Sequence, residues 1–230
     1  MSNFLAELAS AKSEREIRTL LRQIADHAGF ETYALAVGHA PEKGLPTTVW
    51  HNFPQGWDGV GEPGMVERDP VARLVRAPNP APVIWGQTLY WREGASDLWE
   101  LFSSKGIRSG IDVPIRNPDG TRLVLTLATD QDNLPRGEEL IRQMNVAVGA
   151  AHCFGAVVPG IVEAQQFAAS LPRNHFDLLC YVLDGLPLEA LSRRFQRTER
   201  QILSLLRQLA HSAGLGSPMA AAVLATRGTL

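Results

Sequence analysis

Residues 171–230 constrain the fold most, because they have the pattern of short amphipathic helices that end in a helix-turn-helix. Two apolar stripes at helical spacing are separated by Asp184 and Gly185, and a third helix starts at Thr198. Thr198 and Gln201 have the spacing of a capping box. The stripes consist of Phe176, Leu179 and Leu183, and of Leu188, Leu191 and Phe195. The pattern predicts a small all-α helix-turn-helix domain, a unit that most often reads DNA.

The third helix has one apolar face and one polar face. Its apolar stripe consists of Ile202, Leu206, Leu209 and Ala213. The polar face carries side chains that can bind base edges or phosphates. We predict DNA contacts from Thr198, Arg200, Gln201, Ser204, Arg207, Gln208 and His211. A helix face that is only solvated would have a similar composition, and the residues by themselves leave this alternative open.

This segment resembles the C-terminal domain of LuxR-type transcription factors, and it aligns with that domain without gaps from Leu171 to Leu230. The matched positions are Leu171, Asp177, Leu179, Tyr181, Gly185, Leu191, Thr198, Glu199, Arg200, Ile202, Leu206, Gly214 and 221–230. The departures from the family's usual residues are 174–177, Leu186, Pro187, Leu203, Ser204, Leu205 and Ser212. The resemblance implies a DNA-binding regulator. The departures remove phosphate contacts, so they lower the expected affinity for DNA.

The first two thirds of the chain mix helical and strand patterns. A helix is predicted from Ser13 to Ala28, because Ser13 begins a capping box and an apolar stripe follows. Strands are predicted at 33–37 and 47–51, a hairpin at 111–128, and a long helix at 137–154. This order predicts an α/β protein whose N-terminal domain is an α/β/α sandwich around an antiparallel sheet.

Gly155, Pro159 and Gly160 interrupt the helical pattern after the long helix, which indicates a linker. The predicted division is a sensor and dimerisation domain over 1–156, a linker over 157–170 and the helix-turn-helix domain over 171–230.

The predicted hairpin has two different faces, because side chains alternate along a strand. One face is wholly apolar and belongs to the core: Ile111, Val113, Ile115, Leu123, Leu125 and Leu127. The other face is mixed: Gly110, Asp112, Arg122, Val124, Thr126 and Ala128. A mixed face is compatible with a ligand cavity or with simple exposure to solvent.

Residues 15–155 resemble the autoinducer-binding domain of LuxR-type proteins. The positions that carry the resemblance are Pro54, Trp57, Asp69, Pro70, Val71, Trp85, Gly106, Gly110 and Pro114. The resemblance implies that Trp57 donates to a lactone carbonyl and that Asp69 accepts from an acyl amide. The predicted ligand-binding residues are Phe53, Trp57, Asp69, Trp85, Gly110, Asp112, Arg122 and Thr126.

The pocket departs from the family pattern at four positions. Phe53 and Gly61 stand where tyrosines are usual, and Asp112 and Arg122 stand where small or apolar residues are usual. Burying these two charges against a fatty chain is costly unless they pair with each other or with a polar ligand. We therefore predict a small-molecule signal of unknown identity rather than a standard long-chain acyl-homoserine lactone. No metal or other cofactor is predicted.

Composition agrees with a regulator. Residues 161–230 carry 7 basic and 5 acidic side chains, whereas residues 1–160 carry 15 and 19. The basic excess at the C-terminal end suits contact with DNA. Cys153 and Cys180 have no metal-ligand spacing, no apolar run has membrane-spanning length, and no signal peptide is seen, so a cytoplasmic protein is expected. The glycine-rich stretch 59–64 is not preceded by a strand, and nothing else indicates an enzyme.

The sequence therefore predicts a LuxR-type transcriptional regulator that binds DNA as a homodimer. Two alternatives stay open. One is an interaction protein that forms mixed dimers with another LuxR-type protein and has lost ligand or DNA binding. The other is a small-molecule-binding domain whose helix-turn-helix serves only as a dimer contact.

Overall fold

A computed structural model of the chain describes residues 7–8, 10–39, 48–54 and 63–229. The chain divides into two compact units. We call residues 1–11 and 16–159 the sheet unit, and residues 12–15 and 160–230 the helical unit.

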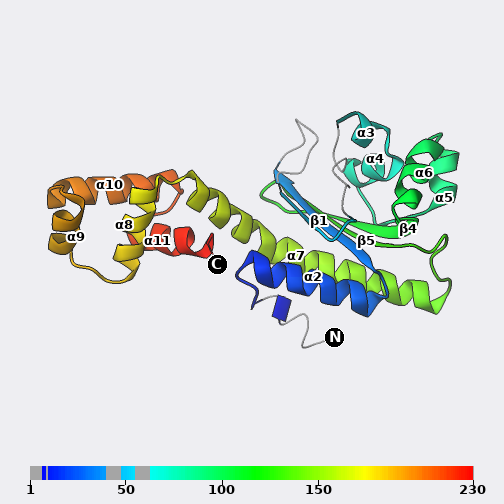
Figure 1. Cartoon of the computed structure of the whole chain (residues 1–230), viewed down its shortest axis with the longest axis horizontal. Helices are drawn as coiled ribbons and strands as arrows, with labels where there is room; N and C mark the ends of the chain where they lie inside the picture. Colours follow the sequence, from blue (N-terminus) through cyan, green and yellow to red (C-terminus); the bar gives the residue numbers. More distant parts are fainter. Residues whose placement is uncertain (1–6, 9, 40–47, 55–62, 230) are drawn as a thin grey trace. The chain divides into compact units, whose positions relative to one another are not determined.

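The sheet unit is built on a five-stranded antiparallel sheet with strand order β2-β1-β5-β4-β3. Its strands are β1 (Thr32–His39), β2 (Thr48–His51), β3 (Val83–Trp85), β4 (Ser109–Arg116) and β5 (Thr121–Thr129). Helix α2 (Glu14–Ala28) and the part of α7 (Glu138–Ser170) that belongs to this unit lie on one face of the sheet (Figure 1). The other face carries α3 (Pro63–Arg68), α4 (Pro70–Arg76), α5 (Gln87–Arg92) and α6 (Ser96–Ser104). The predicted antiparallel sheet between helical layers is confirmed.

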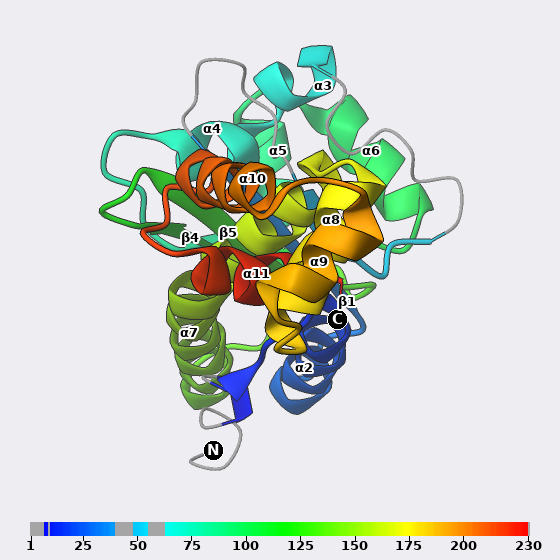
Figure 2. The ribbon, with the colours of Figure 1, turned by 90° about the vertical axis from the view of Figure 1, so that its left-hand side faces the viewer.

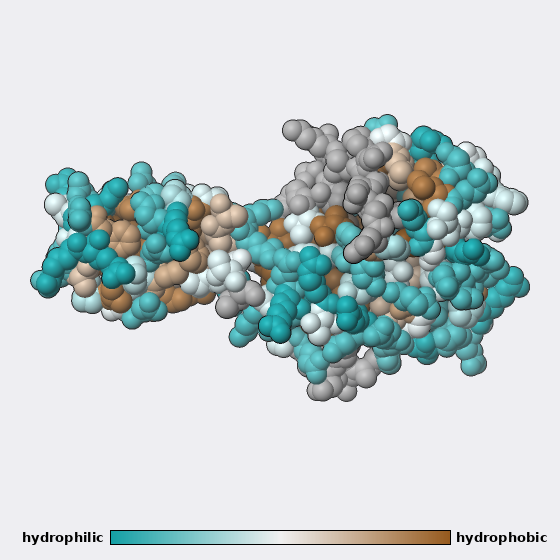
Figure 3. Space-filling view, viewed as in Figure 1, coloured by the Kyte–Doolittle hydropathy of each residue, from teal (hydrophilic) through white to brown (hydrophobic). Residues whose placement is uncertain are grey.

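The hydrophobic core lies between the sheet and the α2 and α7 layer. The predicted apolar face of the β4–β5 hairpin is buried throughout, and β1 adds Tyr33, Leu35 and Val37 to it. The predicted stripe of α2 is also buried: Ile17, Leu20, Leu21, Ile24 and Ala28. The outer side of α2 is hydrophilic, as the teal colour over this helix shows (Figure 3). The alternating apolar residues of the strands and the apolar stripe of the helix thus pack together in one core.

The predicted end of the long helix at Phe154 is wrong, because α7 continues to Ser170 and includes Pro159. Proline has no amide hydrogen, so the carbonyl of Gly155 loses its helical donor. The side chain of Asn117, in the β4–β5 turn, donates to this carbonyl at 2.7 Å. Gly155 is also a packing residue, since a Cβ there would lie 2.8 Å from Cγ2 of Ile115. The residues predicted to form a linker are therefore helical.

By length and composition alone, α7 could cross a membrane, contrary to the sequence-based prediction. Less than half of the most apolar 18-residue stretch of α7 is buried. Within the sheet unit, Ala147, Ala150 and Phe154 are nevertheless fully or almost fully buried, as expected of a core helix.

The helical unit contains α8 (Arg173–Leu183), α9 (Leu188–Phe195), α10 (Glu199–Ser212) and α11 (Pro218–Arg227). These helices lie together in both ribbon views (Figures 1 and 2). They share one core: Leu178, Leu179, Leu191, Ile202, Leu206, Leu209, Ala210, Ala221, Ala222 and Ala225. Of the predicted stripe of α10, Ile202, Leu206 and Leu209 are buried, and Ala213 ends the helix half-buried. Gln196, in the left-handed conformation, ends α9 just before the turn to α10.

Candidate functional site

Asp69 joins two helices, α4 and α5, on the side of the sheet opposite α2 and α7. Its Oδ1 caps α4 by accepting from the amide of Val71 at 2.9 Å. The hydroxyl of Tyr90, in α5, donates to the same oxygen at 3.1 Å. Burial raises the pKa of Asp69, and burial together with the nearby Asp69 and Asp112 carboxylates raises the pKa of Tyr90. Asp69 is therefore a desolvated acceptor that the protein already uses twice.

Asp112, on β4, is a second buried carboxyl group on this side and is only 8% exposed. The indole Nε1 of Trp85, on β3, donates to its Oδ1 at 2.7 Å. The hydroxyl of Thr126, opposite it on β5, donates to Oδ2 at 3.0 Å. Burial, reinforced by the charge of Asp69, raises the pKa of Asp112 to about 7. Its two donors stabilise the ionised form, but they do not offset the loss of water around it.

Gly110 lets the Trp85 indole lie flat against β4. A Cβ at Gly110 would come within 2.5 Å of Cζ2 of Trp85 and of the carbonyl oxygen of Leu127. The rings of Trp85 and Tyr90 form a T-shaped contact at 6.3 Å between centroids, and the rings of Tyr90 and Phe102 of α6 form another at 5.7 Å. These aromatic contacts connect the surroundings of Asp69 with those of Asp112.

The central strands present small side chains on the same side of the sheet. Ala34, Ala36 and Gly38 on β1 pair with Thr126, Val124 and Arg122 on β5. Along β5, the residues of the core face are buried, whereas Arg122, Val124 and Thr126 are half-buried. Small and half-buried side chains beside a polar cluster are the kind of surface that a small-molecule site needs.

The structure brings five of the eight predicted ligand-site residues together: Asp69, Trp85, Gly110, Asp112 and Thr126. Phe53 is half-buried at the edge of the same cluster and stacks on His51 at 4.7 Å. Trp57 lies outside the described residues. Arg122 does not pair with Asp112, because it faces Gly38 and Arg116 near the opposite end of the hairpin.

Tyr90 was missed by the sequence analysis although it binds Asp69. A tyrosine is amphipathic, and a buried one usually needs a partner for its hydroxyl. Its place five residues after Trp85, in the short helix that follows β3, was the available signal. Strand β3 was also missed, because three residues are too few to show alternation.

The seven residues predicted to contact DNA are all exposed, and all lie on α10 or at its N-terminus. The capping box is present: the amide of Thr198 donates to Oε1 of Gln201 at 2.9 Å, and the amide of Gln201 donates to Oγ1 of Thr198 at 3.3 Å. The side chains of these two residues are therefore occupied by the helix end. Arg200, Ser204, Arg207, Gln208 and His211 remain as the exposed polar set.

The arginines around α10 differ in their partners. Arg193 pairs with Glu189 at 2.6 Å, and Arg194 lies over the ring of Tyr181 at 4.3 Å. In the described part of the chain, no ion pair engages Arg200 or Arg207. These two cations are available to an anionic partner.

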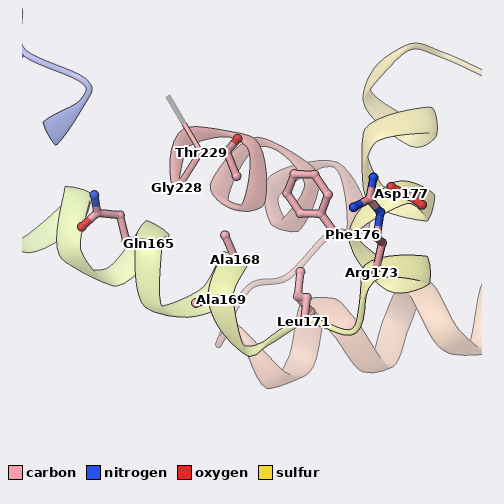
Figure 4. A pocket seen from close by; sticks show the side chains of 9 residues that line it. All are labelled: Gln165, Ala168, Ala169, Leu171, Arg173, Phe176, Asp177, Gly228 and Thr229. Carbon is pink, nitrogen blue, oxygen red and sulfur yellow. The ribbon is translucent and has the colours of Figure 1, made fainter. Parts of the chain in front are cut away.

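The helical unit has an open cavity of about 500 Å³ (Figure 4). Its lining consists of Gln165, Ala168, Ala169, Leu171, Arg173, Phe176, Asp177, Gly228 and Thr229. Gly228 allows the end of α11 to lie against α7, because a Cβ there would collide with the backbone of Ala164. Over the residues that the structure describes, no group of His, Cys, Asp and Glu could hold a metal ion.

The sheet unit thus combines an α/β/α sandwich with a polar cluster on one sheet face, as expected of a small-molecule sensor domain. Residues 13–154 match the family model described as "Autoinducer binding domain", and the chain belongs to this family. It is 25% identical over 210 residues to the transcriptional activator protein AnoR of Acinetobacter nosocomialis, which covers 88% of both proteins. The LuxR-type relationship predicted from the sequence is confirmed at the level of the family.

Solved structures support the fold. SdiA of Escherichia coli superposes with a TM-score of 0.56 at 15% identity, covering 100% of this chain and 96% of SdiA. CepR2 of Burkholderia cenocepacia, described as an N-acylhomoserine lactone-dependent LuxR family transcription factor, superposes with a TM-score of 0.52 at 18% identity. That match covers 67% of this chain and 91% of the CepR2 chain.

Proposed function

We propose that the chain is a cytoplasmic LuxR-type transcriptional regulator, with a sensor domain over residues 1–156 and a DNA-binding domain over residues 171–230. The family match over residues 13–154, together with similarity to a transcriptional activator along 88% of the chain, carries the proposal. Residues 157–170 connect the two domains as the last part of α7. The regulator works as a homodimer, because helix-turn-helix proteins of this size gain affinity by binding two half-sites.

The sensor binds a small molecule on the side of the sheet where Asp112 of β4 and Asp69 at the start of α4 lie, but not a standard long-chain acyl-homoserine lactone. Asp112 supports this proposal, because a buried carboxyl group with no cationic partner is poorly matched to an alkyl chain. Phe53, which lacks a hydroxyl group, supports it too.

A panel of unsubstituted acyl-homoserine lactones with long chains should leave the melting temperature of the purified protein unchanged. A tight ligand would raise the melting temperature, because at one hundred times its Kd it stabilises the folded protein by about 2.7 kcal/mol through mass action. Differential scanning fluorimetry over a range of lactone concentrations makes the measurement. A rise that grows with concentration and saturates would contradict this assignment.

The two free arginines of α10 should have different effects on DNA binding. Arg200 is in the first helical turn, so Arg200→Ala should weaken the preferred site about tenfold and relax the choice of one base pair. Arg207 lies two turns further along, so Arg207→Ala should weaken all duplexes alike and lower the salt slope by about one. Salt titrations on duplexes selected from a random pool separate the two effects. Arg92→Ala, on the sheet unit, is the matched control and should behave as wild type.

Leu203 decides between DNA reading and the mixed-dimer alternative. It is 40% exposed on α10, whereas Leu205 packs against the helical core. Leu203→Lys adds a cation at an exposed position. If the wild-type protein binds DNA, this variant should bind the same DNA more tightly. If wild type shows no salt-dependent binding while Leu203→Lys acquires it, the interaction protein becomes the better proposal.

A further inference from the structure

Asp112 holds a central place in the proposed sensor site, on which this inference rests. It lies on β4 beside the half-buried face of β5, and the Trp85 indole and the Thr126 hydroxyl fix both of its oxygens. Tyr90 contacts the Trp85 ring in a T-shaped arrangement and donates to Asp69, so it links the surroundings of the two carboxyl groups. A ligand that reaches from Asp69 along the sheet therefore passes Asp112.

The two donors leave part of the bonding capacity of Asp112 unused. A carboxylate has about four acceptor positions, and Trp85 and Thr126 occupy two of them. An alkyl chain placed beside Asp112 would remove the remaining water without replacing it. A ligand group with N–H or O–H hydrogens would fill the unused positions, and a positive charge on it would strengthen the bond.

Arg122 cannot take the place of such a ligand group. It lies four residues from Thr126 along β5, which is about 13 Å at the usual rise of a strand. No cation of the described residues forms an ion pair with Asp112. The charged group that acts on Asp112 is the carboxylate of Asp69, which is negative like the ionised Asp112.

We propose that Asp112 is the specificity-determining residue of the sensor, and that the ligand is an amphiphile with a protonated amine beside it. Ligands with unsubstituted acyl chains are excluded from this site, because they would remove water from Asp112 without offering it a hydrogen-bond donor. Trp85 and Thr126 act as positioning residues, since they hold the carboxylate in one orientation.

The test compares matched pairs of probes on the full-length protein. The probes are acyl-homoserine lactones with four, six or eight carbons in the chain, each ending in either a methyl or an ammonium group. Isothermal titration calorimetry at pH 8, where Asp112 is mostly ionised, gives the Kd values. The variants are Asp112→Asn, which keeps the size of the side chain, and Asp112→Leu. Asp130→Asn, at an exposed aspartate just after β5, is the control.

Wild type should bind an ammonium-terminated probe of one length at least tenfold more tightly than its methyl partner, which is the usual strength of one charge-assisted hydrogen bond. Asp112→Asn should lose this preference, and Asp112→Leu should reverse it. Asp130→Asn should keep it. If Asp112→Leu does not fold, the Asn variant decides by itself.

Equal binding of the two probes by wild type would overturn the inference and leave the sensor proposal intact. A preference that survives in Asp112→Asn, or disappears in Asp130→Asn, would also overturn it. If no probe binds wild type or any variant, the inference is overturned, whereas the sensor proposal, which does not require a lactone ligand, stands.

Discussion

Asp112→Asn should remove a loss of stability that wild type undergoes between about pH 4 and pH 7. The pKa of Asp112 is about 7 in the folded protein and near 3.8 in an unfolded chain. Between these values the folded state keeps a proton that the unfolded state has released, so stability falls as pH rises. The stability that the protonated Asp112 contributes to the folded state is fully present below about pH 4 and is lost above about pH 7. At 1.36 kcal/mol per pKa unit, the difference approaches about 4 kcal/mol.

Urea unfolding of both proteins at several pH values, followed by tryptophan fluorescence, gives the comparison. The free energy of unfolding of Asp112→Asn, minus that of wild type, should increase by a few kcal/mol from pH 4 to pH 8. Asp69 has a raised pKa as well and shifts stability in the same direction, but it is present in both proteins, so only its coupling with Asp112 remains in the difference. Asp130→Asn, at an exposed position just after β5, is the control for a substitution outside the buried polar cluster. A constant difference for Asp112→Asn would show that this group is not desolvated in the folded protein.

Local patterns were enough to predict the sheet unit in outline. Alternation in the β4–β5 hairpin identified Val113 and Leu125 as core and Asp112 and Thr126 as the other face, and the structure pairs them in this way. Alternation depends only on backbone geometry, so one strand contains the whole signal. The capping box at Thr198 was predictable for the same reason, since both partners lie within one helical turn.

Apart from the short strand β3, the features that the sequence did not predict depend on contacts between distant residues. Pro159 looks like a helix breaker because its local cost is visible in the sequence. The compensating donor to the Gly155 carbonyl is Asn117, which lies in a turn 38 residues before Gly155. Asp69 and Tyr90 are 21 residues apart, and Trp85 and Asp112 are 27 apart. The composition of the candidate site was therefore predictable, but its hydrogen bonds were not. The partners of Asp112 are Trp85 and Thr126 on adjacent strands, whereas the sequence left open whether it pairs with Arg122 or with a polar ligand.

Gly110→Ala should destabilise the sheet unit by about 3 kcal/mol, the upper end of the usual cost of overpacking. The added Cβ would lie 2.5 Å from the backbone oxygen of Leu127, which cannot move without disturbing the pairing of β4 with β5. It would also push the Trp85 indole off β4 and break its 2.7 Å hydrogen bond to Asp112. The stability of the sheet unit and the polar cluster around Asp112 should therefore be lost together.

Gly149→Ala is the matched control, because Gly149 lies inside α7 and a Cβ there meets no atom within 4 Å. Alanine in a helix interior should stabilise the protein by up to about 1 kcal/mol. Urea unfolding measures both variants, and the chemical shift of the Trp85 indole proton reports whether its bond to Asp112 persists. If Gly110→Ala unfolds at the same urea concentration as wild type, or keeps that chemical shift, then β4 does not depend on close contact with Trp85. In that case the position of the indole would be set by Asp112 and Thr126 rather than by the glycine.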